Sequence, residues 1–341
     1  MPKKILFILL FVISPDFIGA INYSQTDSLA LRGIDLVHHN QFQEGIEVLK
    51  QITALYPEEP MGYFFIAAAY QTLIDTYRNE KYKADFEKYI ELAIKKSDQK
   101  IKSPHPQATD YFYVGASYGY RGINRSFRGD WWGAFWDGGR GKKNLEKALE
   151  LDPTNYHAYY GLGTYNYWRS VKSKILWWLP FFGDQRKKGI AYTKLSIAKG
   201  KFAKDEAKWS LIRIYTEEKN YNQVLIWADS IKLINLEDIQ GRWFTGLAYI
   251  GLGKWPEAER NYIEIISLCK NSPYYNVAGE VEARYYLAWI YYNQNLLPKS
   301  LGQLGFIFAN QQEIKDNDYA KDFIDKAKEL KEKIKQRQKG K

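Results

Sequence analysis

A unit of two helices separated by a stop recurs along this chain, and it limits the possible fold more than any other feature. Its clearest copy is Gly141–Gly163, where Leu145 and Ala148 continue an apolar stripe with a period near 3.6 residues. Asp152-Pro153 ends the first helix, because proline lacks the amide that another turn needs. The unit predicts a helical hairpin, and its recurrence predicts a stack of hairpins.

The spacing between equivalent positions of the two helices also repeats. Four pairs are each twelve residues apart: Gly33 and Gly45, Ile212 and Val224, Gly246 and Ala258, and Ala288 and Ser300. This pattern resembles the tetratricopeptide repeat (TPR), a helical hairpin of about 34 residues. The resemblance implies an all-α, right-handed α-solenoid of about seven TPR-like helix pairs with a C-terminal capping helix. We expect it to form one elongated domain.

The start of the chain is typical of an exported bacterial-type protein. Lys3 and Lys4 precede an apolar run over residues 5–13, which is shorter than the roughly 20 residues that span a bilayer. We therefore predict a signal peptide over residues 1–20 and a periplasmic location, with secretion as the alternative. A single TPR solenoid is expected over residues 21–341. Its repeats are expected near residues 26–59, 60–100, 108–155, 156–203, 205–238, 239–272 and 281–314, with the capping helix at residues 318–336.

Repeats three and four each carry fourteen extra residues, because Gly115 to Gly141 and Gly163 to Gly189 span twenty-six positions instead of twelve. The inserts, near residues 121–138 and 169–186, share a Trp/Phe/Arg pattern. Since neighbouring repeats place their inserts on the same edge, we expect the two inserts to touch. The candidate binding residues of this edge are Trp131, Trp132, Phe135, Trp136, Arg140, Trp177, Trp178, Phe181, Phe182 and Arg186.

Several roles fit these inserts. Trp and Arg dominate the energetics of protein interfaces, so the edge suits a protein partner. Indole rings flanked by cations also suit an anionic membrane surface, and a glycan could stack on them. The structural alternative is that both inserts fold together into a buried aromatic subcore, with glycines 133, 138 and 139 forming turns.

A second candidate surface is the concave groove. One helical position is aromatic in six of the seven repeats, and these candidate groove residues are Phe64, Phe112, Tyr160, Trp209, Trp243 and Tyr285. If they face the groove, they form a ladder for an extended protein segment or peptide. The alternative is ordinary packing against the neighbouring helix.

Catalysis finds no support in the sequence, because no phosphate loop, nucleophile elbow or metal-ligand spacing is present. We therefore expect no enzyme activity, no catalytic residues, no metal and no cofactor. The formal charge of +10 is not accompanied by a nucleic-acid fold motif, so no nucleic-acid partner is expected. The sequence predicts a non-catalytic exported scaffold that mediates protein–protein interaction through the groove, the insert edge or both. The alternative is peripheral membrane or cell-envelope polymer binding through the inserts.

Overall fold

The computed structural model describes residues 23–172, 183–232 and 237–339, and every regular element within these ranges is a helix. The helices pair in chain order, as the repeat pattern predicts, and the all-α solenoid fold is confirmed. The pairs are α1 (Tyr23–His38) with α2 (Phe42–Leu55), α3 (Pro60–Tyr77) with α4 (Lys83–Lys100), α5 (Ala108–Phe127) with α6 (Trp131–Leu151), α7 (Tyr156–Lys172) with α8 (Arg186–Lys199), α9 (Lys204–Glu217) with α10 (Tyr221–Lys232), α11 (Ile239–Gly251) with α12 (Trp255–Lys270), and α13 (Val277–Asn293) with α14 (Leu297–Ala309).

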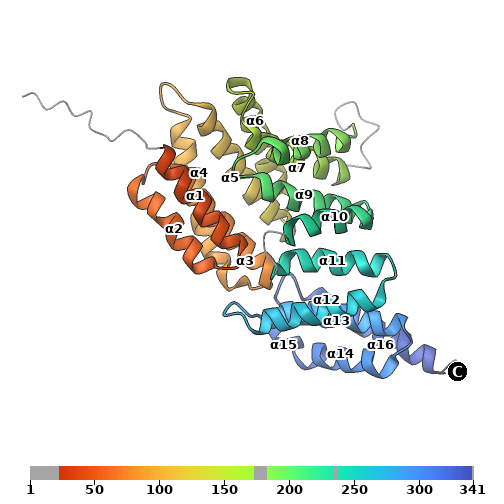
Figure 1. Ribbon diagram of the computed structural model, residues 1–341. Helices are drawn as coiled ribbons and strands as arrows, with labels where there is room; N and C mark the ends of the chain where they lie inside the picture. Colours follow the sequence, from red (N-terminus) through yellow and green to blue (C-terminus); the bar gives the residue numbers. More distant parts are fainter. Residues whose placement is uncertain (1–22, 173–182, 233–236, 340–341) are drawn as a thin grey trace, which may run out of the picture.

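Each pair packs against the next, which gives the curved stack seen in Figure 1. The last pair begins at Val277, ahead of the expected position 281, because the Asn276 side chain caps the helix and accepts a hydrogen bond from Ala278 N at 2.9 Å. The short helix α15 (Gln311–Ile314) and the final helix α16 (Asp322–Lys339) follow it. α16 buries its apolar stripe on the last pair and so covers the end of the stack.

The stack also closes on itself, which the repeat pattern does not predict. The C-terminal end of α3 meets α11, where Trp243 Nε1 donates a hydrogen bond to Thr76 O at 3.1 Å (Figure 1). Arg78 pairs with Glu282 of α13, with 2.7 Å between Nε and Oε2. Buried side chains of the first and last pairs therefore share one apolar cluster. The elongated array expected from the sequence is replaced by a stack whose ends are in contact.

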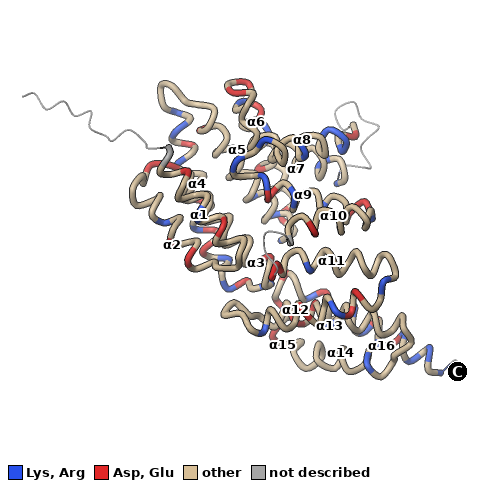
Figure 2. The backbone as a smooth tube through the Cα atoms, viewed as in Figure 1, with Lys and Arg blue, Asp and Glu red and all other residues tan. Residues whose placement is uncertain are grey.

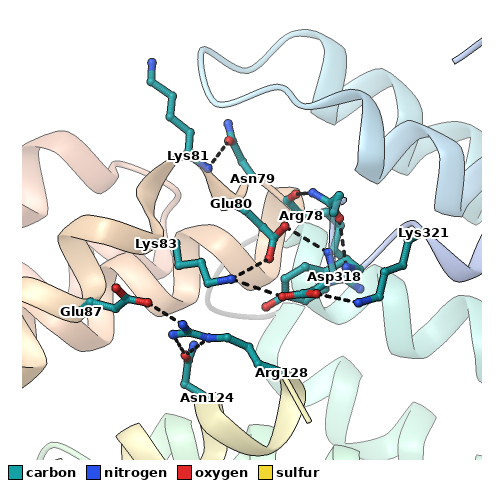
Figure 3. Close-up of polar contacts among 12 residues, drawn as sticks. Arg78, Asn79, Glu80, Lys81, Lys83, Glu87, Asn124, Arg128, Asp318 and Lys321 are labelled. Carbon is teal, nitrogen blue, oxygen red and sulfur yellow. Dashed lines mark hydrogen bonds and ion pairs between the residues drawn. The ribbon is translucent and has the colours of Figure 1, made fainter. Parts of the chain in front are cut away.

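Polar groups between α15 and α16 complete this contact. Asp318 lies 3.3 Å from Lys83 Nζ and 2.8 Å from Lys321 Nζ, and its backbone amide donates to Glu80 Oε2 at 3.0 Å (Figure 3). Glu80 belongs to the 3-10 turn η1 (Glu80–Tyr82), which follows α3. The segment before α16 thus holds the turn between α3 and α4 by ion pairs and a backbone hydrogen bond.

The closure leaves one carboxylate in an unfavourable position, and this gives a testable pH dependence. Asp238 caps α11 through Gly241 N at 3.0 Å, but its other oxygen is buried with no hydrogen-bond partner among the described residues. Burial raises the pKa of Asp238 from 3.8 to about 6, against the hydrogen bond from Gly241 and the charge of His38. Between these pKa values the folded chain keeps a proton that the unfolded chain has lost. The contribution of Asp238 to stability therefore falls as pH rises from about 4 to 6.

We expect Asp238→Asn to raise the free energy of unfolding at pH 7.5 by about 1–2 kcal/mol, because it keeps the cap and removes a buried charge. At pH 4 the substitution should change little, since the carboxyl group is then already neutral. Urea denaturation at both pH values, followed by circular dichroism, measures the difference. An equal effect at both pH values would show that the ionisation of Asp238 does not matter.

Candidate functional site

A cavity of about 1200 Å³ lies on the inner side of the stack. Its walls come from α1, α3, α5, α6, α7 and α9, so hairpins far apart in the sequence contribute to one space. Phe64, Phe65 and Phe112 form much of its apolar wall. We call this space the aromatic cavity.

Small residues on α5 make room for the cavity. Gly115 and Gly141 allow α5 and α6 to cross closely, since a Cβ on Gly115 would lie 2.9 Å from the Gly141 carbonyl oxygen. Gly119 lies one turn further along α5, and a Cβ there would meet no atom within 4 Å. The space in front of Gly119 therefore belongs to the cavity and not to the helix contact.

Aromatic side chains surround the opening of the cavity. We call Phe127, Trp131, Trp132 and Phe135 the aromatic rim, because all four line the cavity and are exposed, Trp132 by 76%. They lie at the turn between α5 and α6, where Asp130 caps α6 by accepting a hydrogen bond from Gly133 N at 2.9 Å. Together they form an exposed apolar patch at the end of the first insert.

A buried carboxylate fixes the two helices that carry the rim. Asp137 of α6 pairs with Arg121 at 2.8 Å and with Arg125 at 2.9 Å, and both arginines lie on α5. The first insert is therefore an extension of both helices, and Gly133, Gly138 and Gly139 lie within α6 instead of forming turns. Two of the cations that flank the insert in the sequence point inward and are paired.

The other candidate residues of the insert edge have different positions. Trp136 is 69% exposed and does not line the cavity, and its ring packs edge-on against Phe135 with 5.7 Å between centroids. Arg140 lies over the Tyr118 ring and pairs with Asp98 at 3.2 Å. The four aromatic residues of the first insert are thus exposed.

The second insert is described only at its ends. Trp177, Trp178, Phe181 and Phe182 lie outside the described residues. Arg186 pairs locally with Asp184 at 2.8 Å. At the other end Lys172 Nζ lies 5.7 Å from the centre of the Trp131 ring, so the end of α7 adjoins the aromatic rim.

The expected ladder of groove aromatics is divided by the structure. Phe64, Phe112 and Tyr160 line the aromatic cavity. Trp209 and Trp243 are buried, and Tyr285 packs against Phe323 of α16 with 5.1 Å between ring centroids. The prediction of a continuous ladder along the concave face is therefore wrong, because closure of the stack and the capping helix cover the C-terminal half of that face.

The inner part of the cavity contains charged groups that sequence spacing did not reveal. Arg213 of α9 lies 3.4 Å from Asp75 of α3, yet 36% of its side chain is accessible because it faces the cavity. Glu206 lies 3.4 Å from His38 Nε2. Burial acts to lower the pKa of His38, but the hydrogen bond and charge of Glu206, together with the charges of Asp205 and Asp238, raise this pKa overall. Burial lowers the pKa of His157 to about 4, so this cavity residue is neutral near pH 7.

Metal-ligand groups and membrane-spanning helices are two features that would indicate other functions. Among the described residues, no three His, Cys, Asp or Glu side chains are grouped so that they could hold a metal ion. No helix in the same part of the chain is long and apolar enough to cross a membrane. The described geometry can enclose and orient a ligand by apolar contact and charge.

Comparisons with known proteins concern the fold alone. No family model and no curated protein matches the chain. Similar solved structures include the C-terminal part of a TPR repeat-containing protein from Cytophaga hutchinsonii, at 17% identity over 82% of this chain and 94% of that chain, with a TM-score of 0.41. The human IFIT1 dimer with PPP-AAAA is 16% identical over 83% of this chain and 63% of that chain, with a TM-score of 0.46. These structures are TPR-repeat proteins.

The sequence predicted some of the residues of the aromatic cavity and missed others. The Trp/Phe/Arg pattern of the first insert predicted three of the four rim residues but not Phe127, and the aromatic repeat position predicted three wall residues. Arg213, Glu206 and His38 were not predicted, because α9 and α1 meet only through the closure of the stack. A signal in the sequence that could have identified them is not apparent.

Proposed function

We propose that this chain is a non-catalytic binding scaffold whose aromatic cavity encloses an elongated apolar ligand. The observation that carries the proposal is the cavity of about 1200 Å³, with apolar walls and exposed tryptophans at its opening. Ligand sites in proteins are typically concave, mostly apolar and about 300–1,000 Å³ in volume. The stacked hairpins supply a rigid frame, and binding would release water from a large apolar surface.

The proposal includes export to the periplasm, for which the signal-like residues 1–20 are the support. These residues lie outside the described residues. A ligand met outside the cytoplasm would reach the cavity through the aromatic rim.

We expect the hydrophobic fluorophore N-phenyl-1-naphthylamine to bind the chain saturably. Replacing Trp131, Trp132 and Phe135 together by alanine should weaken this binding at least tenfold, because about 1.4 kcal/mol of lost contact energy corresponds to that factor. The three side chains are exposed, so thermal stability should change little. Fluorescence titration measures the binding, and circular dichroism the stability.

The matched control replaces Leu55, Ile226 and Ile263 by alanine. These residues are also exposed and apolar, but they lie away from the cavity. The control variant should bind the fluorophore like the parent chain. Equal losses in both triple variants, or no saturable binding by the parent, would contradict the proposed function.

A second candidate function is docking of a protein partner on the outer side of the insert. It is favoured by Trp136, which is 69% exposed and does not line the cavity. Arg140 lies one turn further along α6, and Trp with Arg is the pairing that most often dominates protein interfaces. Trp136→Ala should then weaken association with a purified partner protein while leaving fluorophore binding unchanged.

A further inference from the structure

We infer that the aromatic cavity takes up an anionic lipid, with its acyl chains along the wall at Gly119 and its phosphate at the cationic end of the opening. This inference rests on the proposed function, because it names the class of ligand for the same cavity. It follows from the size of the cavity, from the sign of the charges that line it and from their position beside the rim.

The volume and lining of the aromatic cavity suit a long apolar ligand. A volume of about 1200 Å³ lies above the roughly 300–1,000 Å³ of ordinary small-molecule sites. Most of the lining is apolar, including Phe64 and Phe112, and the hydroxyl groups of Tyr120, Tyr160, Thr164 and Ser210 are interspersed among the apolar side chains. Such a space suits long hydrocarbon chains better than a compact polar metabolite.

The charged side chains that line the cavity are mostly cationic. Among the residues that the structure describes, six cationic side chains line the cavity and only one carboxylate, that of Glu206, does so. The six cations are Arg128, Lys142, Arg169, Lys172, Arg213 and Lys321. Arg213 is matched by Asp75 at 3.4 Å, and Glu206 by His38, so the innermost charges are largely compensated. Arg128 pairs with Glu87, Lys142 with Glu146 and Lys321 with Asp318, and none of these three carboxylates lines the cavity. The positive charge that favours an anionic group is therefore assigned to Arg169 and Lys172, which lie together on the last turn of α7.

Two of these cations lie beside the aromatic rim. Arg169 and Lys172 lie on the last turn of α7, and Lys172 Nζ is 5.7 Å from the Trp131 ring centre. Arg128, which follows α5 and also lines the cavity, pairs with Glu87 and donates a hydrogen bond to Asn124 Oδ1 (Figure 3). Cations beside exposed indole rings, with an apolar space behind them, match the order of phosphate, glycerol and acyl chain in a lipid.

The charge is local and is not a property of the whole surface. Figure 2 shows basic and acidic residues interspersed along most of the stack. A nucleic acid would need a row of cations along its backbone, whereas here Arg169 and Lys172 lie together beside an apolar space. The cavity therefore favours a ligand with one anionic end.

The experiment measures lipid uptake. The full chain is incubated with vesicles of dioleoyl phosphatidylglycerol or dioleoyl phosphatidylcholine and separated from them by gel filtration. Lipid retained by the protein is then quantified by mass spectrometry. We expect about one phosphatidylglycerol per chain and at least tenfold less phosphatidylcholine, since the two lipids share their chains and differ in net charge.

Two pairs of variants locate the lipid. Gly119→Leu places a side chain in the empty space and should reduce uptake at least fivefold, whereas Gly139→Leu, on the exposed face of α6, should not. Leucine favours helix more than glycine does, so both variants should fold. Arg169→Gln with Lys172→Gln should abolish the preference for phosphatidylglycerol. Lys187→Gln with Lys188→Gln removes the same charge outside the cavity and should preserve the preference.

Four outcomes would overturn the inference. Equal retention of both lipids would show that charge does not select the ligand. Uptake unaffected by Gly119→Leu would place the lipid on the surface, and adsorption to vesicles without retained lipid would indicate a membrane-surface role. Tighter binding of a 5′-phosphorylated RNA oligonucleotide than of phosphatidylglycerol would indicate a nucleic-acid site. Binding of the neutral fluorophore N-phenyl-1-naphthylamine tests the cavity without a charged group. If the fluorophore binds but phosphatidylglycerol is not retained, the inference fails and the proposed function stands.

Discussion

Replacing Arg78 by methionine should lower the free energy of unfolding by about 3–5 kcal/mol, the usual effect of removing one partner from a buried ion pair. Arg78 Nε lies 2.7 Å from Glu282 Oε2, and both side chains are largely buried. The guanidinium also lies over the rings of Trp243 and Tyr319, at 4.7 and 5.2 Å from their centres. Methionine would leave the Glu282 carboxylate buried without its cation and would loosen the contact between α3 and α13.

Two further variants isolate the ion pair. Arg140→Met removes a partly exposed arginine that pairs with Asp98, and it should cost less than about 1 kcal/mol. Arg78→Met combined with Glu282→Met should be more stable than Arg78→Met alone, because no unpaired charge remains. Urea denaturation followed by circular dichroism provides all the values. If Arg78→Met and Arg140→Met have the same effect, the closure does not depend on this pair.

Alanine at Gly163 should lower the free energy of unfolding by about 3 kcal/mol, although alanine is the better helix former by about 1 kcal/mol. A Cβ on Gly163 would lie 2.8 Å from the carbonyl oxygen of Gly189, and a Cβ on Gly189 would lie 2.7 Å from that of Gly163. The two glycines therefore set the distance between α7 and α8. Backbone atoms cannot move aside like the end of a flexible side chain, so the whole helix pair would have to separate.

Gly302→Ala is the matched control, because a Cβ there would meet nothing within 4 Å on the exposed face of α14. It should raise stability by up to about 1 kcal/mol through helix propensity alone. Opposite signs for the two glycine substitutions, measured by thermal and urea denaturation, would support the close crossing. A stabilising Gly163→Ala would show that α7 and α8 are further apart than the structure places them.

The helix pairs could be predicted because their signals are local. The twelve-residue spacing from Gly33 to Gly45 marks a helix crossing, and Asp152-Pro153 marks a helix end. Neither signal depends on residues far away in the chain. The first insert was harder to interpret, because Gly133, Gly138 and Gly139 indicate turns by composition. The cap at Asp130 and the two ion pairs of Asp137 hold them in a helix instead.

The candidate site could be predicted only in part, for a related reason. Phe64, Phe112 and Tyr160 were found by the repeat position, and all three line the aromatic cavity. Trp243 occupies the same position but is buried, because its indole donates to the carbonyl oxygen of Thr76 in α3. That contact joins residues 167 positions apart. Periodicity over one repeat carries no information about such a contact, so neither the closure nor the charged inner part of the cavity could be predicted.

Lys321 belongs to two features of the molecule at once. It pairs with Asp318 in the segment that ties the last hairpins to the turn after α3, and it also lines the aromatic cavity. Any shift of the segment between α15 and α16 would therefore move a residue of the cavity lining, although this segment carries none of the residues of the aromatic rim.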